Sequence, residues 1–237
     1  MGRHLTRESR REQRPRASFA QQYAFAALTI PKESDGQIDA SSMMQILGWA
    51  LARPIGTVRY SYAIPDDTAL DLLAARAPIV EIGAGTGYWT YLLRQRGVDV
   101  LAFDANPPLD DTHSNEFHRN DLAVGVIWSE VLIGGPEQAA RHSDRALFLC
   151  WPPPGDPMAA DALAAYQGQC VIFIGEWNPK TAADEAFFAA LEESWELEEV
   201  YELPRWFGMK DRMSVWMRGG NVVAGKEHSA RRLRDRG

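Results

Sequence analysis

The stretch APIVEIGAGTGYW, residues 77–89, constrains the fold more than any other part of this sequence. Its first half is a short apolar run rich in β-branched residues, which predicts a buried strand. Glycines follow at 83, 85 and 87, and a helical pattern then ends at Gly97. A second apolar run, 98–103, ends at Asp104. Strand, glycine turn, helix, strand and terminal acid are the layout of a nucleotide-binding βαβ unit.

The spacing of the glycines indicates which class of nucleotide cofactor the loop can bind. A dinucleotide fingerprint, G-x-G-x-x-G, needs a glycine at position 88, where Tyr88 is too large for the helix to press on the strand. With Glu81 two residues before Gly83, the segment instead resembles motif I of the class I S-adenosylmethionine-dependent methyltransferases. The resemblance extends over about residues 77–218 and is strongest in the first third.

This resemblance implies S-adenosylmethionine as the cofactor. The glycine loop would let the backbone approach its methionine half, and Asp104, 21 positions after Gly83, would hold the two ribose hydroxyls. The alternatives are a solvated strand-end acid for Glu81 and a turn acid for Asp104. The predicted cofactor-binding residues are Tyr60, Glu81, Gly83, Ala84, Gly85, Gly87, Asp104, Ala105, Gly134 and Cys150.

The order of elements predicts an α/β fold. Beyond the βαβ unit we expect strands over 124–133, 146–150 and 171–174, with helices over 137–144, 158–166 and 182–194. Two strands within 195–218, joined through 204–212, must be antiparallel because their connection is so short. The result is a doubly wound, mostly parallel seven-stranded sheet with an antiparallel last strand and helices on both faces.

Four regions follow from composition. They are a basic tail at 1–18 with a disordered-type composition, a helical N-terminal extension or cap at 19–76, a cofactor-binding domain at 77–220, and a basic tail at 221–237. In the extension, residues 19–28 are largely apolar and aromatic. A helix starting at Asp39 and closed by Pro54 has an apolar face, and Asp66 or Asp67 caps the next helix. The residues of that apolar face are Met43, Met44, Ile46, Leu47 and Leu51.

Charge and cysteine content limit the partners. The chain has 25 Lys and Arg against 32 Asp and Glu, of which the two tails hold eleven and four, which leaves 14 against 28 in the body. An acidic body disfavours a nucleic-acid substrate. No run is long and apolar enough for a membrane span, and no signal segment is visible, so we expect a cytoplasmic protein. Cys150 and Cys170 are expected to be core thiols, without a metal site.

The methyl acceptor would lie beyond the ends of the fourth and fifth strands. The fourth ends in Cys150-Trp151-Pro-Pro-Pro, which departs from the Asp/Asn-Pro-Pro-Tyr motif of amino methyltransferases and so removes the main support for adenine-type methylation. Trp151 is expected to form a wall of the acceptor pocket or to pack in a loop. Glu176 is expected either to orient or deprotonate the acceptor, or to cap the segment that follows it or pair with an Arg. Tyr62 lines the site or packs, and His113 and His118 are expected to be exposed loop residues.

These observations predict a methyltransferase that acts on a small-molecule or peptide acceptor, such as a natural product, by direct displacement at the methyl carbon. Trp151, Glu176 and Tyr62 are its candidate catalytic residues. The alternatives are a protein methyltransferase and a non-catalytic regulator that binds S-adenosylmethionine. The sequence identifies neither the atom that is methylated nor the oligomeric state.

Overall fold

The computed structural model describes residues 40–108, 115–120, 123–124, 126–206 and 208–219. The two basic tails, the apolar segment at 19–28 and His113 lie outside these residues. What the sequence predicts for them, and the predicted domain boundaries, stay predictions.

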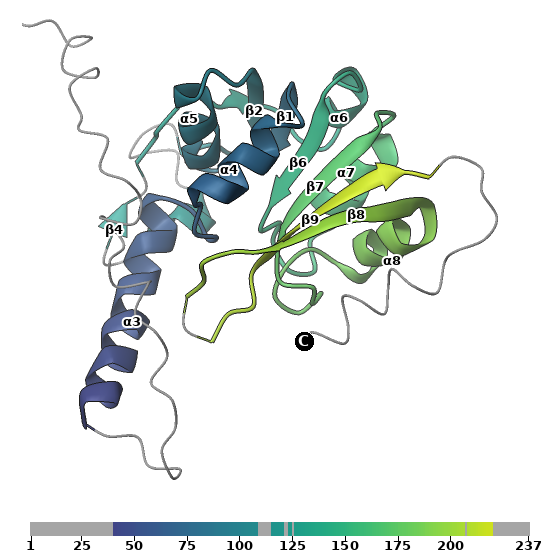
Figure 1. The fold of residues 1–237 in the computed structure, drawn as a ribbon. Helices are drawn as coiled ribbons and strands as arrows, with labels where there is room; N and C mark the ends of the chain where they lie inside the picture. The colour runs from purple at the N-terminus through teal and green to yellow at the C-terminus, as the bar shows by residue number, and fades with distance from the viewer. Residues whose placement is uncertain (1–39, 109–114, 121–122, 125, 207, 220–237) are drawn as a thin grey trace, which may run out of the picture.

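One seven-stranded sheet forms the centre of the protein (Figure 1). Its strand order is β5-β2-β1-β6-β7-β9-β8. The strands are β1 (Ile79–Ile82), β2 (Val100–Asp104), β5 (Leu132–Ile133), β6 (Ala146–Cys150), β7 (Cys170–Gly175), β8 (Trp195–Glu202) and β9 (Arg212–Arg218). The first five are parallel, whereas β9 lies between β7 and β8 and is antiparallel to both. The predicted doubly wound sheet with an inserted antiparallel strand is confirmed.

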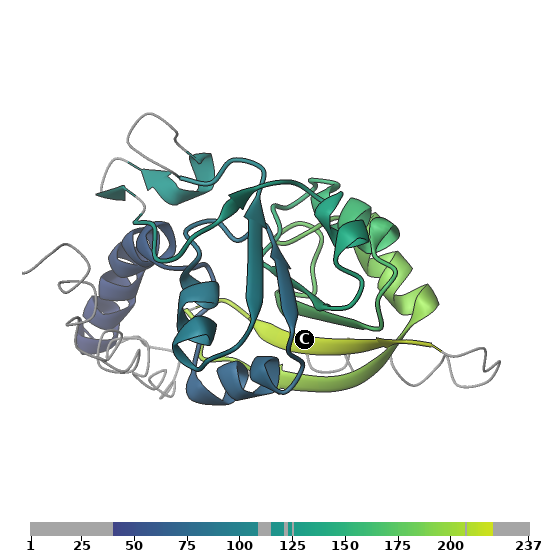
Figure 2. The ribbon, with the colours of Figure 1, turned by 90° about the horizontal axis from the view of Figure 1, so that it is seen from above.

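Helices cover both faces of this sheet (Figure 2). Ile79 of β1 packs on the face that carries α4 (Asp67–Ala74) and α5 (Tyr88–Gln95). Its neighbour Val80 packs on the other face, because side chains alternate along a strand. The helices of that second face are α6 (Gln138–Arg141), α7 (Met158–Ala165) and α8 (Glu185–Ser194). Asp66 is the cap of α4, since its Oδ1 accepts the Ala69 N–H at 2.8 Å.

The predicted third strand over 124–133 is wrong for most of its length. Only β5 joins the main sheet, while β4 (Ala123–Val124) pairs with β3 (Arg119–Asn120) in a separate hairpin. Between them, the Trp128 amide donates to the Thr86 carbonyl at 2.9 Å and its indole Nε1 donates to the Arg59 carbonyl at 2.6 Å. Trp128 therefore bonds to the glycine loop and to Arg59, the last residue of the N-terminal helix, whereas a residue in a strand would bond to a neighbouring strand.

The N-terminal helix α3 (Ala40–Arg59) runs through Pro54, so the predicted end at that proline is also wrong. Proline removes one backbone donor, but the residues after it, Gly56, Thr57 and Val58, are buried and hold the last turn against the domain. The rest of α3 points away from the sheet (Figure 1). Within the described residues, no helix combines the length and the apolar character that crossing a membrane requires.

Insertion of β9 into the sheet depends on Trp216. Its side chain is fully buried, stacks on Trp177 with 5.4 Å between ring centroids, and donates from Nε1 to the Ser214 hydroxyl at 2.9 Å. We expect Trp216→Ala to lower the free energy of unfolding by about 3–5 kcal/mol in urea titrations. Val200 on β8 is exposed, so Val200→Ala is the control and should lower the free energy of unfolding by less than about 1 kcal/mol. Equal effects would contradict this packing.

Candidate functional site

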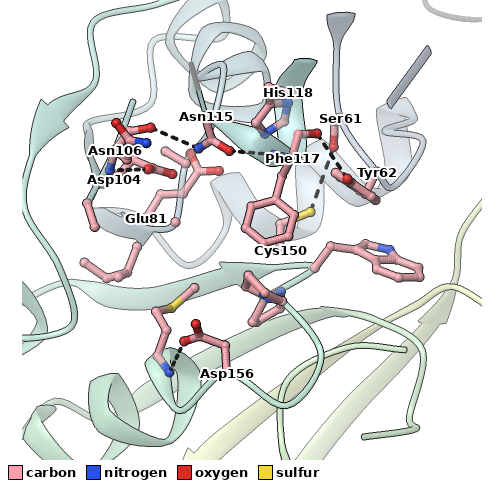
Figure 3. A pocket seen from close by; sticks show the side chains of 18 of the residues that line it. Ser61, Tyr62, Glu81, Asp104, Asn106, Asn115, Phe117, His118, Cys150 and Asp156 are labelled. Atoms are coloured by element: carbon pink, nitrogen blue, oxygen red, sulfur yellow. Dashed lines mark hydrogen bonds between the residues drawn. The ribbon is translucent and has the colours of Figure 1, made fainter. Parts of the chain in front are cut away.

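A cavity of about 800 Å³ lies at the carboxyl ends of β1, β2 and β6 (Figure 3). Ten of the predicted site residues line it: Tyr60, Tyr62, Glu81, Gly83, Ala84, Asp104, Ala105, Gly134, Cys150 and Trp151. Three predicted residues are not among its lining residues: Gly85, Gly87 and Glu176. The sequence therefore located the cavity, while the roles of single residues within it stay proposals.

The glycine loop after β1 needs its glycines for two physical reasons. Gly83, Gly85 and Gly87 have φ of 77°, 53° and 70°, in the left-handed region that favours glycine. Space is also short, because a Cβ on Gly85 would collide with the imidazole of His118, and one on Gly87 would lie 2.8 Å from Cγ2 of Val131. Gly85 and Gly87 thus accommodate neighbouring side chains, and Gly83 with Ala84 faces the cavity.

Asp104 joins the end of β2 to this loop. Its Oδ2 accepts the Gly85 N–H and its Oδ1 accepts the Asn106 N–H, both at 2.8 Å. The residue is 8% exposed and lines the cavity. Each carboxylate oxygen keeps a further lone pair, so the group can accept two more hydrogen bonds from a ligand.

Residues 115–118 run along the cavity and connect its two ends. Asn115 Nδ2 donates to the Asn106 carbonyl at 3.0 Å, and Asn115 Oδ1 accepts the Phe117 N–H at 2.9 Å. The Phe117 carbonyl in turn accepts the Tyr62 hydroxyl at 3.1 Å (Figure 3). Sequence reasoning missed Asn115, because only the fold brings this polar loop back over β2.

Glu81 is the most deeply buried carboxylate of the cavity wall, with 1% exposure. It accepts a short hydrogen bond from the Thr90 hydroxyl. Burial raises the pKa of Glu81 to about 7, against the opposing effects of the Thr90 hydrogen bond and the Arg94 charge. A carboxyl group with such a pKa changes its charge near neutrality and gains most from a cationic ligand group.

His118 contradicts the expectation of an exposed loop residue. Its imidazole is only partly exposed and packs on the glycine loop at Gly85. Burial lowers the pKa of His118, while the nearby Asp104 charge opposes that shift. The imidazole is therefore a neutral packing group near pH 7 that holds residues 115–118 against the loop.

Comparisons with known proteins found partial similarities. No family model matches the chain. It is 35% identical over 65 residues to the ribosomal RNA large subunit methyltransferase M of Azoarcus sp. (strain BH72), which covers 27% of this chain and 18% of that protein. It is 28% identical over 97 residues to the protein-L-isoaspartate O-methyltransferase of Chlorobium phaeovibrioides (strain DSM 265 / 1930), which covers 41% of this chain and 41% of that protein. The chain thus spans less than half the length of either relative.

Two solved structures are similar in outline. The magnesium protoporphyrin IX methyltransferase of Synechocystis PCC 6803 has a TM-score of 0.43 at 13% identity, over 78% of this chain and 87% of that one. The 1,6-didemethyltoxoflavin-N1-methyltransferase of Burkholderia thailandensis has a TM-score of 0.42 at 14% identity, over 79% of this chain and 94% of that one. The strand order, with β9 inserted between β7 and β8 and with a glycine loop between β1 and α5, decides the fold. This chain has the class I methyltransferase fold.

In this methyltransferase fold the cavity continues past the end of β6, along Trp151 and the prolines that follow it, on the side where the acceptor was predicted. Trp151 lies there beside Tyr62, with 5.8 Å between ring centroids. Its φ is 51°, an unfavourable backbone conformation for a bulky residue, and its amide donates to the Ile174 carbonyl at 2.8 Å. Backbone strain of this kind gathers at functional sites. The geometry supports Trp151 and Tyr62 as an aromatic wall.

Cys150 and Tyr60, two predicted cofactor residues, have mainly structural contacts. Cys150 Sγ lies 4.0 Å from the Ser61 hydroxyl, which accepts the Trp89 indole N–H at 2.8 Å. Burial raises the pKa of Cys150 well above its usual value, so it stays a thiol. Tyr60 stacks on Trp128, with 5.2 Å between ring centroids. Both residues still line the cavity.

Glu176 was the predicted base, and the structure places it outside the cavity lining. Its Oε1 accepts the Lys210 backbone N–H at 2.7 Å, which matches the local role that sequence reasoning left open. A base role for Glu176 stays a prediction without support from the geometry. No cluster of His, Cys, Asp or Glu that could hold a metal ion occurs in the part of the chain that the structure describes.

Asp211 is the acidic residue that sequence reasoning missed. It directly precedes β9 and is fully buried. Burial and then the Glu176 charge raise the pKa of Asp211 to about 7, opposed by the Arg53 charge, the Trp151 indole and the Arg205 charge. The buried indole N–H of Trp151 lies close enough to the Asp211 carboxyl to lower its pKa. Nothing in the sequence around Asp211 distinguishes it from an exposed turn residue.

The raised pKa of Asp211 predicts a pH-dependent stability. A carboxyl group whose pKa is raised by folding stabilises the protein below its unfolded pKa, and that stability is lost as pH rises through about 7. Asp211→Asn removes the titration, so the free energy of unfolding of the variant should rise relative to that of wild type by roughly 3 kcal/mol between pH 5 and pH 9. Urea titrations at the two pH values measure this. A constant difference between the proteins would contradict the buried carboxyl.

Proposed function

We propose that this chain is an S-adenosylmethionine-dependent methyltransferase. The observation that carries the proposal is the Asp104 carboxylate, which lies at the end of β2, bonds to the glycine loop and faces the cavity. A carboxylate in this place can accept both hydroxyls of a ribose. The methyltransferases that the chain resembles over part of their length agree with this assignment.

The residues of the cavity fit the parts of this cofactor. Asp104 would accept the ribose hydroxyls, the Glu81 carboxylate would balance the charge of the ammonium group, and Gly83 leaves room for the methionine half. When bound, the cofactor supplies an electrophilic methyl group on its sulfonium. Trp151 and Tyr62 orient the acceptor and exclude water, so positioning is the main contribution of the protein.

The acceptor end of the cavity favours a small molecule or a short peptide. Its wall includes Tyr62, Phe117, Trp151 and Pro153, which suit a flat apolar group. The acidic body of the chain disfavours an RNA acceptor. A protein methyltransferase and a non-catalytic regulator stay the alternatives. Transfer of a labelled methyl group to pools of metabolites, peptides or proteins separates the three.

Asp104→Ala tests the ribose assignment. We expect S-adenosylhomocysteine to bind more weakly by about 2–3 kcal/mol in calorimetry, because two hydrogen bonds to a charged acceptor are lost. A 2′,3′-dideoxy analogue should lose affinity in wild type but little more in the mutant. The exposed Glu185→Ala is the matched control and should bind as wild type. If the analogue loses as much in both proteins, Asp104 does not hold the ribose.

Cofactor affinity should depend on pH through Glu81. The ionised carboxylate binds the ammonium group, and the pKa of Glu81 in the free protein is about 7. Affinity for S-adenosylhomocysteine should therefore rise by about tenfold between pH 6 and pH 8, as the ionised fraction rises. Glu81→Gln should bind more weakly and with a flat profile, whereas Asp211→Asn should keep the slope. A slope that survives in Glu81→Gln would assign the titration to another group.

A further inference from the structure

Arg53 brings a positive charge to the wall of an otherwise acidic cavity. It is the sole Lys or Arg among the described residues that line the cavity. The acidic lining residues are Glu81, Asp104, Glu116, Asp156 and Asp161. No described acid lies within ion-pair distance of the Arg53 guanidinium. Because a guanidinium stays charged throughout the working pH range, this part of the wall has a cation without a partner carboxylate among the described residues.

The continuation of α3 through Pro54 fixes the position of Arg53. The Thr57 hydroxyl donates to the Arg53 carbonyl at 3.1 Å, which closes this turn of the helix. Thr57 and the following Val58 are only 6% and 4% exposed, so the turn is anchored on the domain. Side chains four residues apart lie on one side of a helix, and Arg53 therefore shares the buried side with Thr57.

Arg53 lies at the end of the cavity where the aromatic wall is. Burial raises the pKa of both Tyr62 and Asp211, and the Arg53 charge opposes that rise in each. Tyr62 in turn lies beside Trp151, with 5.8 Å between ring centroids, and donates its hydroxyl to the Phe117 carbonyl (Figure 3). The positive charge is therefore next to the aromatic rings that are proposed to hold the acceptor.

The Arg53 side chain offers donors that no described residue uses. Its Nε is buried and has no hydrogen-bond partner among the described residues. Burying a charged donor without an acceptor is unfavourable, and a ligand that supplies the acceptor removes that cost. Nε and one Nη form a planar fork that matches the two oxygens of a carboxylate. Asp211 is not that acceptor, because it is not a lining residue and its pKa of about 7 leaves it partly neutral near neutral pH.

We propose that the methyl acceptor carries a carboxylate group, and that Arg53 binds this group while Tyr62 and Trp151 hold a flat apolar part of the same molecule. The inference rests on the proposed function, since it names the chemistry of the acceptor in that reaction. The acids of the lining repel an anion elsewhere in the cavity, so the carboxylate has one favourable place. Arg53 is then a residue that determines specificity.

Binding of aromatic acids to the full-length chain, saturated with S-adenosylhomocysteine, tests this inference. The probes are benzoate, naphthoate and anthracene carboxylate, each compared in calorimetry with its neutral amide. At least one acid should bind wild type about tenfold or more tightly than its amide, because Arg53 donates two charge-assisted hydrogen bonds. Arg53→Met keeps the apolar stem without the donors, so acid and amide should bind it equally. Arg53→Lys keeps the charge without the fork and should show an intermediate preference.

Arg59→Met is the matched control. Arg59 lies on the same helix, is exposed and is not a lining residue, so the variant should keep the preference of wild type. A melting temperature near that of wild type confirms that each variant is folded. A preference that survives in Arg53→Met would assign the carboxylate to another group and overturn the proposal. Equal affinity of wild type for every acid and its amide would overturn it as well.

The carboxylate of the cofactor is the competing occupant of this place. We expect Arg53→Met to bind S-adenosylhomocysteine and its decarboxylated analogue as tightly as wild type does. Weaker binding of S-adenosylhomocysteine alone would assign Arg53 to the cofactor and overturn the proposal.

The comparison of acids with amides is repeated without S-adenosylhomocysteine, to separate this inference from the proposed function. Absence of S-adenosylhomocysteine binding to wild type would contradict the proposed function. A preference for the acid that is lost in Arg53→Met and kept in Arg59→Met would still support the carboxylate site at Arg53.

Discussion

The hydrogen bond from the Gly85 amide to the Asp104 carboxylate joins the two strand ends on which the site depends. It fixes the glycine loop after β1 relative to the end of β2, while the second oxygen of Asp104 orders the turn at Asn106. The loop over the cavity is then attached through Asn115 to that same turn. A carboxylate with two backbone donors and free lone pairs is both a structural anchor and a ready acceptor for a ligand.

Two buried carboxyl groups, Glu81 and Asp211, both have a pKa near 7. Glu81 has a hydrogen-bond donor in Thr90 and lines the cavity. Asp211 is not among the lining residues and lies near the strained Trp151, whose indole opposes the rise of its pKa. Both lower the stability of the folded state when they ionise, a cost that proteins commonly accept at functional sites.

Local patterns predicted the centre of the fold and not its edges. The glycines, the β-branched run before them and Asp104 are all within one βαβ unit, so their spacing in sequence reports their positions in space. The third strand could not be predicted correctly, because Trp128 bonds to Thr86 and Arg59, contacts that only the folded chain creates. The packing of His118 on the glycine loop and the burial of Asp211 have the same origin. The prediction at Pro54 was wrong because the residues after it pack well enough to continue the helix.

A crystal structure of the chain with S-adenosylhomocysteine tests the central claim most directly. The account predicts the ligand in the cavity, with both ribose hydroxyls within hydrogen-bond distance of the Asp104 carboxylate, the ammonium group toward Glu81, and the sulfur facing Trp151 and Tyr62. A ligand bound elsewhere, or a ribose held by groups other than Asp104, would contradict it.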